Sequence, residues 1–343
     1  MRTIVAIFCL LTVVELNARQ PAMTTYEIAP FSEVVFSVGD LSRTERFYTN
    51  VLKWQVVHRG NTDRSILQAW RLPASATARE VVLASPDKPE NGRLRLIQFD
   101  GVPKAYIRPG GKIWDTGGIY DIDLRCANIH ALYDTLREHG WHGLSNPIRY
   151  KMGPFEVWEL LIKGHDDLVI AFIERIEPPL PEPPPRSWAF GNIINSAQIV
   201  KNYDQAKDFY ISKLGFVPIL ETTIRNEQPG ENILSLPYNL STQVTAKLLL
   251  FSPNGKSEGM MELLAMDGAT GEDFSKNAVP PNRGVLMCRY PVKNLNAYHE
   301  KILKNGVQPV VSLQKVSWGG IGEARMFAVQ SPEGAWIEFF EAP

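Results

Sequence analysis

Short apolar runs, each bounded by turn residues, recur along the whole chain and are typical of β-strands. Two stretches instead have a helical spacing of apolar residues, about 129–139 and 295–305, and each is followed by a glycine, the common signal after a helix end. The predicted strands that carry the argument below are residues 33–41, 118–125, 168–174, 284–290 and 336–341. Period two places Trp336 and Glu338 on one strand face, so a carboxyl group is expected among bulky apolar neighbours.

The two halves of the chain repeat one another. Phe47-Tyr48 and Leu52 recur as Phe209-Tyr210 and Leu214 at one constant offset. A second repeat lies between these, because the strand and helix after Gly118 recur after Gly284. Such repeats have to be recognised before a fold is assigned. We therefore predict four units, each a strand, a helix and about three further strands.

Residues 174–189 contain six prolines, which favours a semi-rigid linker. At 343 residues the chain suits two domains, predicted at 28–175 and 190–343 with the linker at 176–189. One unit cannot close a core, because its helix covers a single face of a small sheet. Two units side by side form a curved sheet with a concave face, so the expected α+β fold has two such cups. The linker favours pairing the first unit with the second and the third with the fourth; the other pairing is first with fourth and second with third.

Residues 1–22 are typical of a secretory signal, with Arg2, an apolar run over 4–14 and Ala18 near a cleavage point. We therefore expect an exported protein, periplasmic or secreted. No later apolar run reaches the roughly 18 residues of a membrane helix, so no transmembrane span is expected in the mature chain. A net charge of -1 gives no basis for binding nucleic acid. Cys126 and Cys288 are expected to be buried thiols rather than a disulfide framework.

The chain resembles the vicinal oxygen chelate superfamily, which includes glyoxalase I, extradiol dioxygenases, and fosfomycin and bleomycin resistance proteins. The resemblance rests on Asp40-Leu41 with Phe47-Tyr48 and Leu52, on their repeat in the second half, and on residues 332–338. It covers about 30–343 and implies two glyoxalase-like domains of paired βαβββ units, each a curved mixed sheet with its helices outside. It does not imply one reaction, because this scaffold carries many chemistries.

In metal-binding members the ligands come from the first and last strands of a unit. Carried over to this chain, the first-strand positions are Glu33, Asp121, Asn195 and Met287. The last-strand positions are Arg95, Ala171, Glu262 and Glu338. None of the eight is histidine, which disfavours an extradiol dioxygenase, since non-haem iron oxygenases use two imidazoles and a carboxylate.

Under the pairing that the linker favours, the second half joins Asn195, Glu262 and Glu338. Three oxygen donors suit a divalent ion such as magnesium, manganese or zinc. Without metal, two close carboxyls push one pKa up and serve as acid and base. Two glutamates at strand ends that face solvent or cationic partners are the plain structural alternative.

The first half joins Glu33, Arg95 and Asp121, in which the arginine disfavours a metal. Arg95 is expected either to form an ion pair across the cup or to bind a carboxylate of a ligand. The other pairing of units instead places Asp121, Asn195 and Glu262 in one cup, and Glu33, Arg95 and Glu338 in the other.

The functional hypothesis is an exported protein, monomer or homodimer, that holds a small organic molecule in an apolar cup. The first form of it is a lyase or isomerase with Glu262 and Glu338 as catalytic residues. The residues expected to contact the ligand are Asn195, Glu33, Arg95 and Asp121. The alternative is a non-catalytic binding or sequestering protein of the bleomycin-resistance kind.

Overall fold

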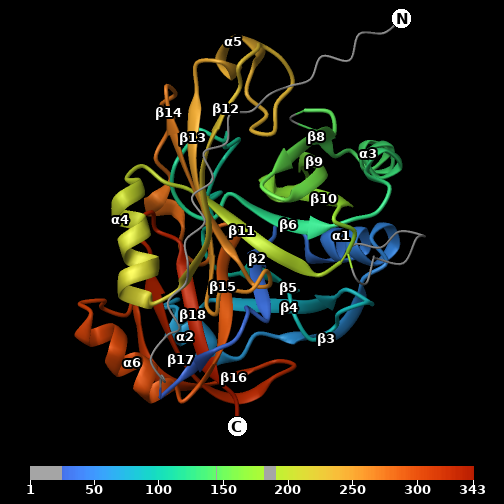
Figure 1. Ribbon diagram of the computed structural model, residues 1–343. Coiled ribbons are helices and arrows are strands. Elements are labelled where there is room, and N and C mark those ends of the chain that lie inside the picture. Colours follow the sequence, from blue (N-terminus) through green and yellow to red (C-terminus); the bar gives the residue numbers. More distant parts are fainter. Residues whose placement is uncertain (1–24, 144, 181–190) are drawn as a thin grey trace, which may run out of the picture.

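The structure is a computed structural model that describes residues 25–143, 145–180 and 191–343 (Figure 1). The predicted signal and residues 181–189 of the predicted linker lie outside the described residues, and export stays a prediction. Within the described part of the chain, no helix has the length and apolar character needed to cross a membrane.

The four predicted units are present. The first comprises β2 (Glu33–Ser37), α1 (Leu41–Arg46), a π-helical turn (Phe47–Val51), β3 (Gln55–Asn61), α2 (Arg64–Ala69), β4 (Thr77–Ala84) and β5 (Arg93–Asp100). The second comprises β6 (Asp121–Arg125), α3 (Ile129–Glu138), β7 (His142–Gly143), β8 (Ile148–Met152), β9 (Phe155–Lys163) and β10 (Val169–Glu177). The third comprises β11 (Ile193–Ile199), α4 (Tyr203–Lys207), a π-helical turn (Asp208–Leu214), β12 (Val217–Arg225), α5 (Tyr238–Ser241), β13 (Thr245–Ser252) and β14 (Met261–Asp267). The fourth comprises β15 (Gly284–Lys293), α6 (Leu295–Lys304), β16 (Val311–Trp318), β17 (Gly322–Gln330) and β18 (Trp336–Glu341).

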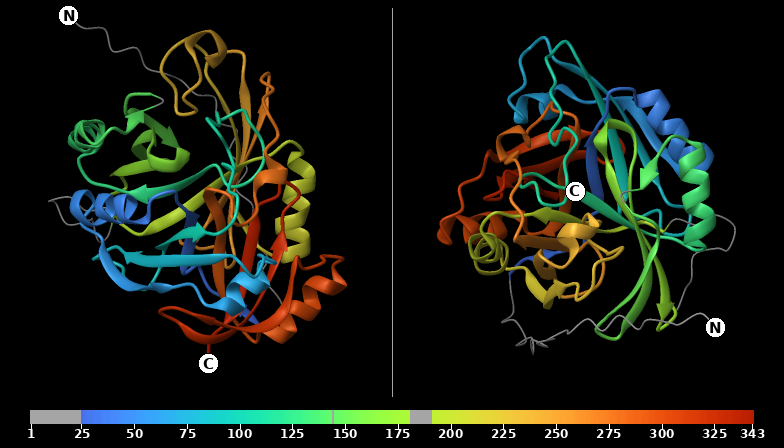
Figure 2. Two further views of the ribbon diagram at one scale, coloured as in Figure 1. Left: turned by 180° about the vertical axis from the view of Figure 1, so that it is seen from behind. Right: turned by 90° about the horizontal axis from the view of Figure 1, so that it is seen from above.

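The units pair first with fourth and second with third, so the pairing that the linker favoured is wrong. The first sheet, called the 1–4 sheet, has the order β16-β17-β18-β15-β2-β5-β4-β3, with the short β1 (Glu27–Ile28) beside β15. The 2–3 sheet has the order β12-β13-β14-β11-β6-β10-β9-β7, with β8 beside β9 (Figures 1 and 2). The proline-rich linker does not separate the two sheets, because of where its two flanking strands lie. The strands before and after it, β10 and β11, flank β6 in one sheet, so the proline-rich segment connects two strands of the same sheet.

Contacts between helical segments join the first unit with the second and the third with the fourth. Phe47 of the first unit stacks on Trp141 of the second, with ring centroids 4.4 Å apart. In the other half, the Tyr298 hydroxyl and the Lys301 ammonium group of α6 donate to the Leu214 carbonyl at 3.1 and 2.7 Å. Figure 1 shows α4 and α6 on one side of the molecule and α1 and α3 on the other. One continuous apolar cluster includes residues of all four helices and of both sheets, and a separate apolar cluster lines each concave face.

The Ser-Pro-Glu-Gly turn before β18 fixes the fourth unit against the second and third. The Glu333 carbonyl accepts from the Gly118 amide at 2.7 Å, and its carboxylate accepts from the Lys201 amide at 3.1 Å. Gly334 closes the turn with φ +84°, and a Cβ there would lie 2.1 Å from the Ser275 carbonyl oxygen. Gly334 is thus required both for its backbone conformation and for a close approach.

We expect Gly334→Ala to lower the free energy of unfolding clearly more than Gly306→Ala. Both glycines have φ near +80°, but nothing lies within 4 Å of a Cβ at Gly306. The control therefore measures backbone strain alone, about 1 kcal/mol, and Gly334→Ala adds a backbone collision to it. Urea unfolding followed by circular dichroism measures both, and equal losses would show that the contact with Ser275 is not tight.

Candidate functional site

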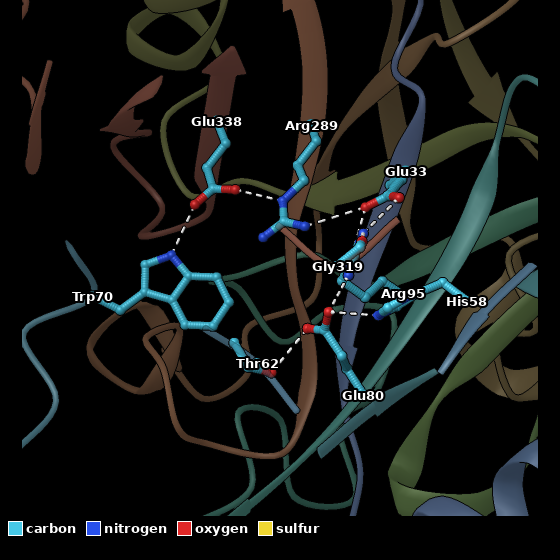
Figure 3. A network of polar contacts seen from close by, with 9 residues as sticks. All are labelled: Glu33, His58, Thr62, Trp70, Glu80, Arg95, Arg289, Gly319 and Glu338. Atoms are coloured by element: carbon cyan, nitrogen blue, oxygen red, sulfur yellow. Dashed lines mark hydrogen bonds and ion pairs between the residues drawn. The ribbon is translucent and has the colours of Figure 1, made fainter. Parts of the chain in front are cut away.

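The concave face of the 1–4 sheet carries a network of five charged side chains, each at most 2% exposed (Figure 3). Arg95 binds Glu33 through two hydrogen bonds, from Nε at 2.8 Å and from Nη2 at 2.9 Å. Its Nη1 also donates to Glu80 Oε1 at 2.6 Å. Arg289 donates from Nε to Glu338 Oε2 at 2.6 Å and from Nη1 to Glu33 Oε2 at 3.1 Å. Each of the three carboxylates therefore contacts at least one guanidinium group.

Neighbouring side chains close this cup. Trp70 Nε1 donates to Glu338 Oε1 at 2.8 Å, and the guanidinium carbon of Arg289 lies 4.3 Å from the centre of the Trp318 ring. At the tip of the β16–β17 hairpin, the Gly319 carbonyl accepts from Arg95 Nη2 at 2.9 Å. Two tryptophan rings and the hairpin tip thus contact the network, and Figure 3 shows Trp70 and Gly319 beside it.

The two arginines of this network favour the ionised form of Glu33. Burial acts to raise the pKa of Glu33, but the charges and hydrogen bonds of Arg95 and Arg289 outweigh it and lower that pKa to about 2. Glu33 therefore stays ionised wherever the protein is folded, because its partners supply the compensation that burial requires. Of the two alternatives stated for Arg95, the structure shows the ion pair across the cup, formed with Glu33, and both side chains are buried.

The 2–3 sheet instead encloses a cavity of about 150 Å³ on its concave face. Four carboxyl groups and one amide line it. They come from three neighbouring strands and from β9, which β10 separates from β6: Asp121 and Asp123 (β6), Asn195 (β11), Glu262 (β14) and Glu159 (β9). Aliphatic side chains of β12 and β13 and of the loop that precedes α5 form much of the wall. The strand register sets the arrangement, since Asn195 lies opposite Asp123 and Ala197 lies beside Glu262.

Hydrogen bonds link these side chains to one another. Asn195 Nδ2 lies 2.8 Å from Asp123 Oδ2 and 3.4 Å from Glu262 Oε2, so it connects the two carboxyls. The Ala197 amide donates to Asp121 Oδ1 at 3.1 Å, and the Tyr150 hydroxyl donates to Glu159. Among the described residues, Asn195 Oδ1 has no hydrogen-bond partner although it is buried.

Burial raises the pKa of all four carboxyls. The pKa of Asp123 rises to about 6, with the Asn195 hydrogen bond opposing the rise, and that of Glu159 rises to about 8. The pKa values of Asp121 and Glu262 stand well above their usual range, because repulsion by neighbouring carboxyls adds to burial. At neutral pH such a site contains both ionised and protonated carboxyls, the condition for a base and an acid in one cavity.

The residues of this cavity do not fit a metal ion as they are placed. Within the described ranges, no group of three or more His, Cys, Asp or Glu side chains could hold one. The Asn195 amide nitrogen, a donor, occupies the point between Asp123 and Glu262, where a cation would need an oxygen atom. The metal set expected from the sequence also does not form, since Glu338 lies in the other sheet.

The structure thus places Glu262 and Glu338, the two glutamates expected to act together in catalysis, in different sheets. The expectation that they share one cup is wrong. Glu262 lies in the 2–3 cavity, whereas Glu338 is bound by Arg289 and Trp70 in the 1–4 sheet. Asn195, Glu262 and Asp121 do come together, as the other pairing of units predicted. Asp123, Glu159 and Tyr150 were missed.

The missed positions have a local cause. In the first and third units the helix caps Asp40 and Asn202 have an extended backbone. The residues that face the cup, Glu33 and Asn195, lie seven positions before these caps. In the second and fourth units the caps Asn128 and Asn294 adopt the left-handed conformation, with φ 55° and 61°. There the residues opposite Asn195 and Glu33 lie five positions before the cap. These residues are Asp123 and Arg289. Asparagine tolerates this conformation, but the extended cap Asn202 is asparagine as well, so residue type at the cap did not reveal the difference.

The comparisons with known proteins agree with this architecture. The sequence profile described as "Glyoxalase/Bleomycin resistance protein/Dioxygenase superfamily" matches residues 31–172 and 193–339. Glyoxalase I from Zea mays has a TM-score of 0.59 at 15% identity, covering 92% of each chain, and a mutant form of it has a TM-score of 0.61. A putative dioxygenase from Bacillus subtilis has a TM-score of 0.56 at 9% identity, covering 92% of this chain and 86% of its own. At these identities the solved structures show the fold alone. No curated protein matches the sequence.

We expect Glu338→Gln to lower the free energy of unfolding by about 3 kcal/mol, because it leaves Arg289 buried with less compensating charge. The control is Glu341→Gln on the same strand, where Glu341 pairs with Arg325 near the surface. Loss of an exposed pair should cost less than about 1 kcal/mol. Chemical unfolding at pH 7 measures both variants, and a Glu338→Gln protein as stable as the control would contradict the structural role.

We expect Glu159→Gln to stabilise the protein at pH 8 and to have no such effect at pH 4. The unfolded chain releases the Glu159 proton near pH 4.5, whereas the folded protein holds it to about pH 8. The folded state therefore binds more protons between these values, and the free energy of unfolding falls as pH rises, by at most about 1.4 kcal/mol per unit. Glu156→Gln on the same strand, which removes a carboxylate paired with Arg149, is the control. A difference between Glu159→Gln and wild type that does not change from pH 4 to 8 would show that Glu159 titrates normally.

Proposed function

This chain belongs to the Glyoxalase/Bleomycin resistance protein/Dioxygenase superfamily, and on that premise we propose that its 2–3 cavity binds a small organic molecule and moves a proton on it. The reaction class is that of an isomerase or lyase acting next to a carbonyl group. One observation carries the proposal: four carboxyl groups with raised pKa values face a cavity whose walls are largely aliphatic.

In this proposal Asp123 is the base and Glu262 is the acid. Asp123, with a pKa of about 6, is mostly ionised at pH 7 and can accept a proton from carbon. Glu262 is assigned as the acid because burial and the repulsion of Asp123 raise its pKa well above the usual range. Asn195 contacts both carboxyls and keeps them side by side. A base and an acid on one cavity floor allow a proton to be removed at one atom and returned at another.

The cavity walls support a second candidate, a non-catalytic binding protein. The wall includes Ile224, Leu234, Leu248 and Leu264, which give a ligand apolar contact and no chemistry. In that case removing one carboxyl should change affinity little. For either candidate, we propose export on the composition of residues 1–22.

We expect Asp123→Asn to lose proton transfer by about 10²–10⁴-fold when the ligand is supplied at a saturating concentration. The ligand is extracted from the purified full chain, identified by mass spectrometry and returned to ligand-free protein in D₂O. Nuclear magnetic resonance then follows the exchange of its C–H for C–D. Asp134→Asn, on the exposed face of α3, is the control and should exchange as wild type does.

Two results would decide between the candidates. Exchange at the wild-type rate in Asp123→Asn would remove Asp123 as the base. Binding without exchange in the wild type would favour the sequestering protein over the isomerase or lyase.

A further inference from the structure

The two concave faces of this molecule differ in whether their buried carboxyl groups form ion pairs. In the 1–4 sheet, three carboxylates are matched by two guanidinium groups in direct contact with them. In the 2–3 cavity, four carboxyls have no ion pair with any described residue, although two cationic side chains, Arg125 and Arg175, line the same cavity. Arg175 instead packs over the Phe155 ring at 4.2 Å. Among the described residues, no cation therefore contacts the carboxyls of this cavity directly, whereas two do so in the 1–4 sheet.

The cavity floor also has a hydrogen-bond acceptor without a donor. The N–H and phenol groups that donate to the carboxyls of the floor are Asn195 Nδ2, the Tyr150 hydroxyl and the Ala197 amide, so each is already engaged. Asn195, only 2% exposed, lines the cavity with an acceptor, Oδ1, that no described residue satisfies. A buried acceptor without a donor is costly, and carboxyl oxygens have further acceptor capacity. The floor is thus complementary to a group that donates hydrogen bonds and carries positive charge.

The walls and the size restrict the rest of the ligand. A cavity of about 150 Å³ with apolar walls is the size of one that holds a benzene molecule. Ile224, Leu234 and Leu248 offer contact to a hydrocarbon body and no polar group. A strongly hydrated inorganic ion would leave this surface without a partner, whereas an organic cation would fill it.

We propose that the ligand of the 2–3 cavity is a small organic amine: an ammonium group held by Asp123, Glu262 and Asn195 Oδ1, on an apolar body about the size of one ring. This rests on the proposed function, because it names the class of molecule that the same cavity takes. The ammonium group supplies both the missing cation and the missing donors. Three N–H bonds match the three acceptors, two of which Asn195 Nδ2 already brings together.

Three probes with the same phenyl ring and a different charge test the proposal: benzylamine (cation), benzyl alcohol (neutral) and benzoate (anion). Each is titrated into the full chain and followed by calorimetry at pH 7. Benzylamine is expected to bind at least about 10-fold more tightly than benzyl alcohol, as charge-assisted bonds are about twice as strong as neutral ones. Benzoate is expected to bind most weakly. Asp123→Asn removes an ionised carboxylate and should weaken benzylamine binding at least about 10-fold. Glu262→Gln replaces a protonated carboxyl and should weaken it less, and both variants should leave benzyl alcohol binding nearly unchanged.

The outcomes distinguish this inference from the proposed function. Benzyl alcohol or benzoate binding as tightly as benzylamine, and lost on filling the cavity with Ala171→Leu, would overturn the amine and keep the cavity as the ligand site. Benzylamine that does not bind, or that binds equally well to both carboxyl variants, would also overturn the amine. Tight binding of Mn²⁺ that Asp123→Asn removes would identify an inorganic cation instead. Thermal unfolding of each variant confirms that it is folded.

Discussion

A carboxyl group at the floor of an apolar cup must contact a cation or keep its proton, because an isolated buried charge is too costly. Both sheets of this protein place acids at their centres, and the rest of each cup follows from how the acids are compensated. In the 1–4 sheet, Arg95 and Arg289 neutralise them, and Trp70 and the hairpin at Gly319 cover the result. In the 2–3 sheet burial raises the pKa values of the acids, so that some keep protons at neutral pH, and a cavity lies in front of them.

The topology explains how one chain holds two such different cups. Each sheet takes one unit from each half of the chain, while helix contacts join the units within a half. The two sheets therefore share one apolar cluster and support each other through their helices. The acids of the closed cup are compensated by ion pairs, whereas those of the other cup lower the free energy of unfolding at neutral pH, because burial raises their pKa values. A stable scaffold and a strained site are thus placed in separate sheets.

Local patterns in the sequence were sufficient for the units but not for the sites. The repeat of Phe47-Tyr48 at Phe209-Tyr210, and the glycines after two helices, fixed the elements, because these signals act over a few residues. The pairing of units depends on contacts across the chain that no local pattern records. The positions that face each cup also depend on cap conformation, so the sequence pointed to Met287 instead of Arg289, and to Asp121 without Asp123. The wrong pairing of units then joined Glu262 with Glu338, and without Arg289 the ion pair of Glu338 could not be foreseen.

The most direct test of this account is the ionisation of the carboxyls themselves, followed by carbon-13 nuclear magnetic resonance on protein labelled at Asp and Glu side chains. Single variants assign each signal. We predict that the Glu33 signal stays ionised down to about pH 2, whereas Asp123 and Glu159 titrate near pH 6 and pH 8. Ordinary titration of Asp123 and Glu159 near pH 4 would contradict the claim that one cup neutralises its acids and the other holds them ready for a ligand.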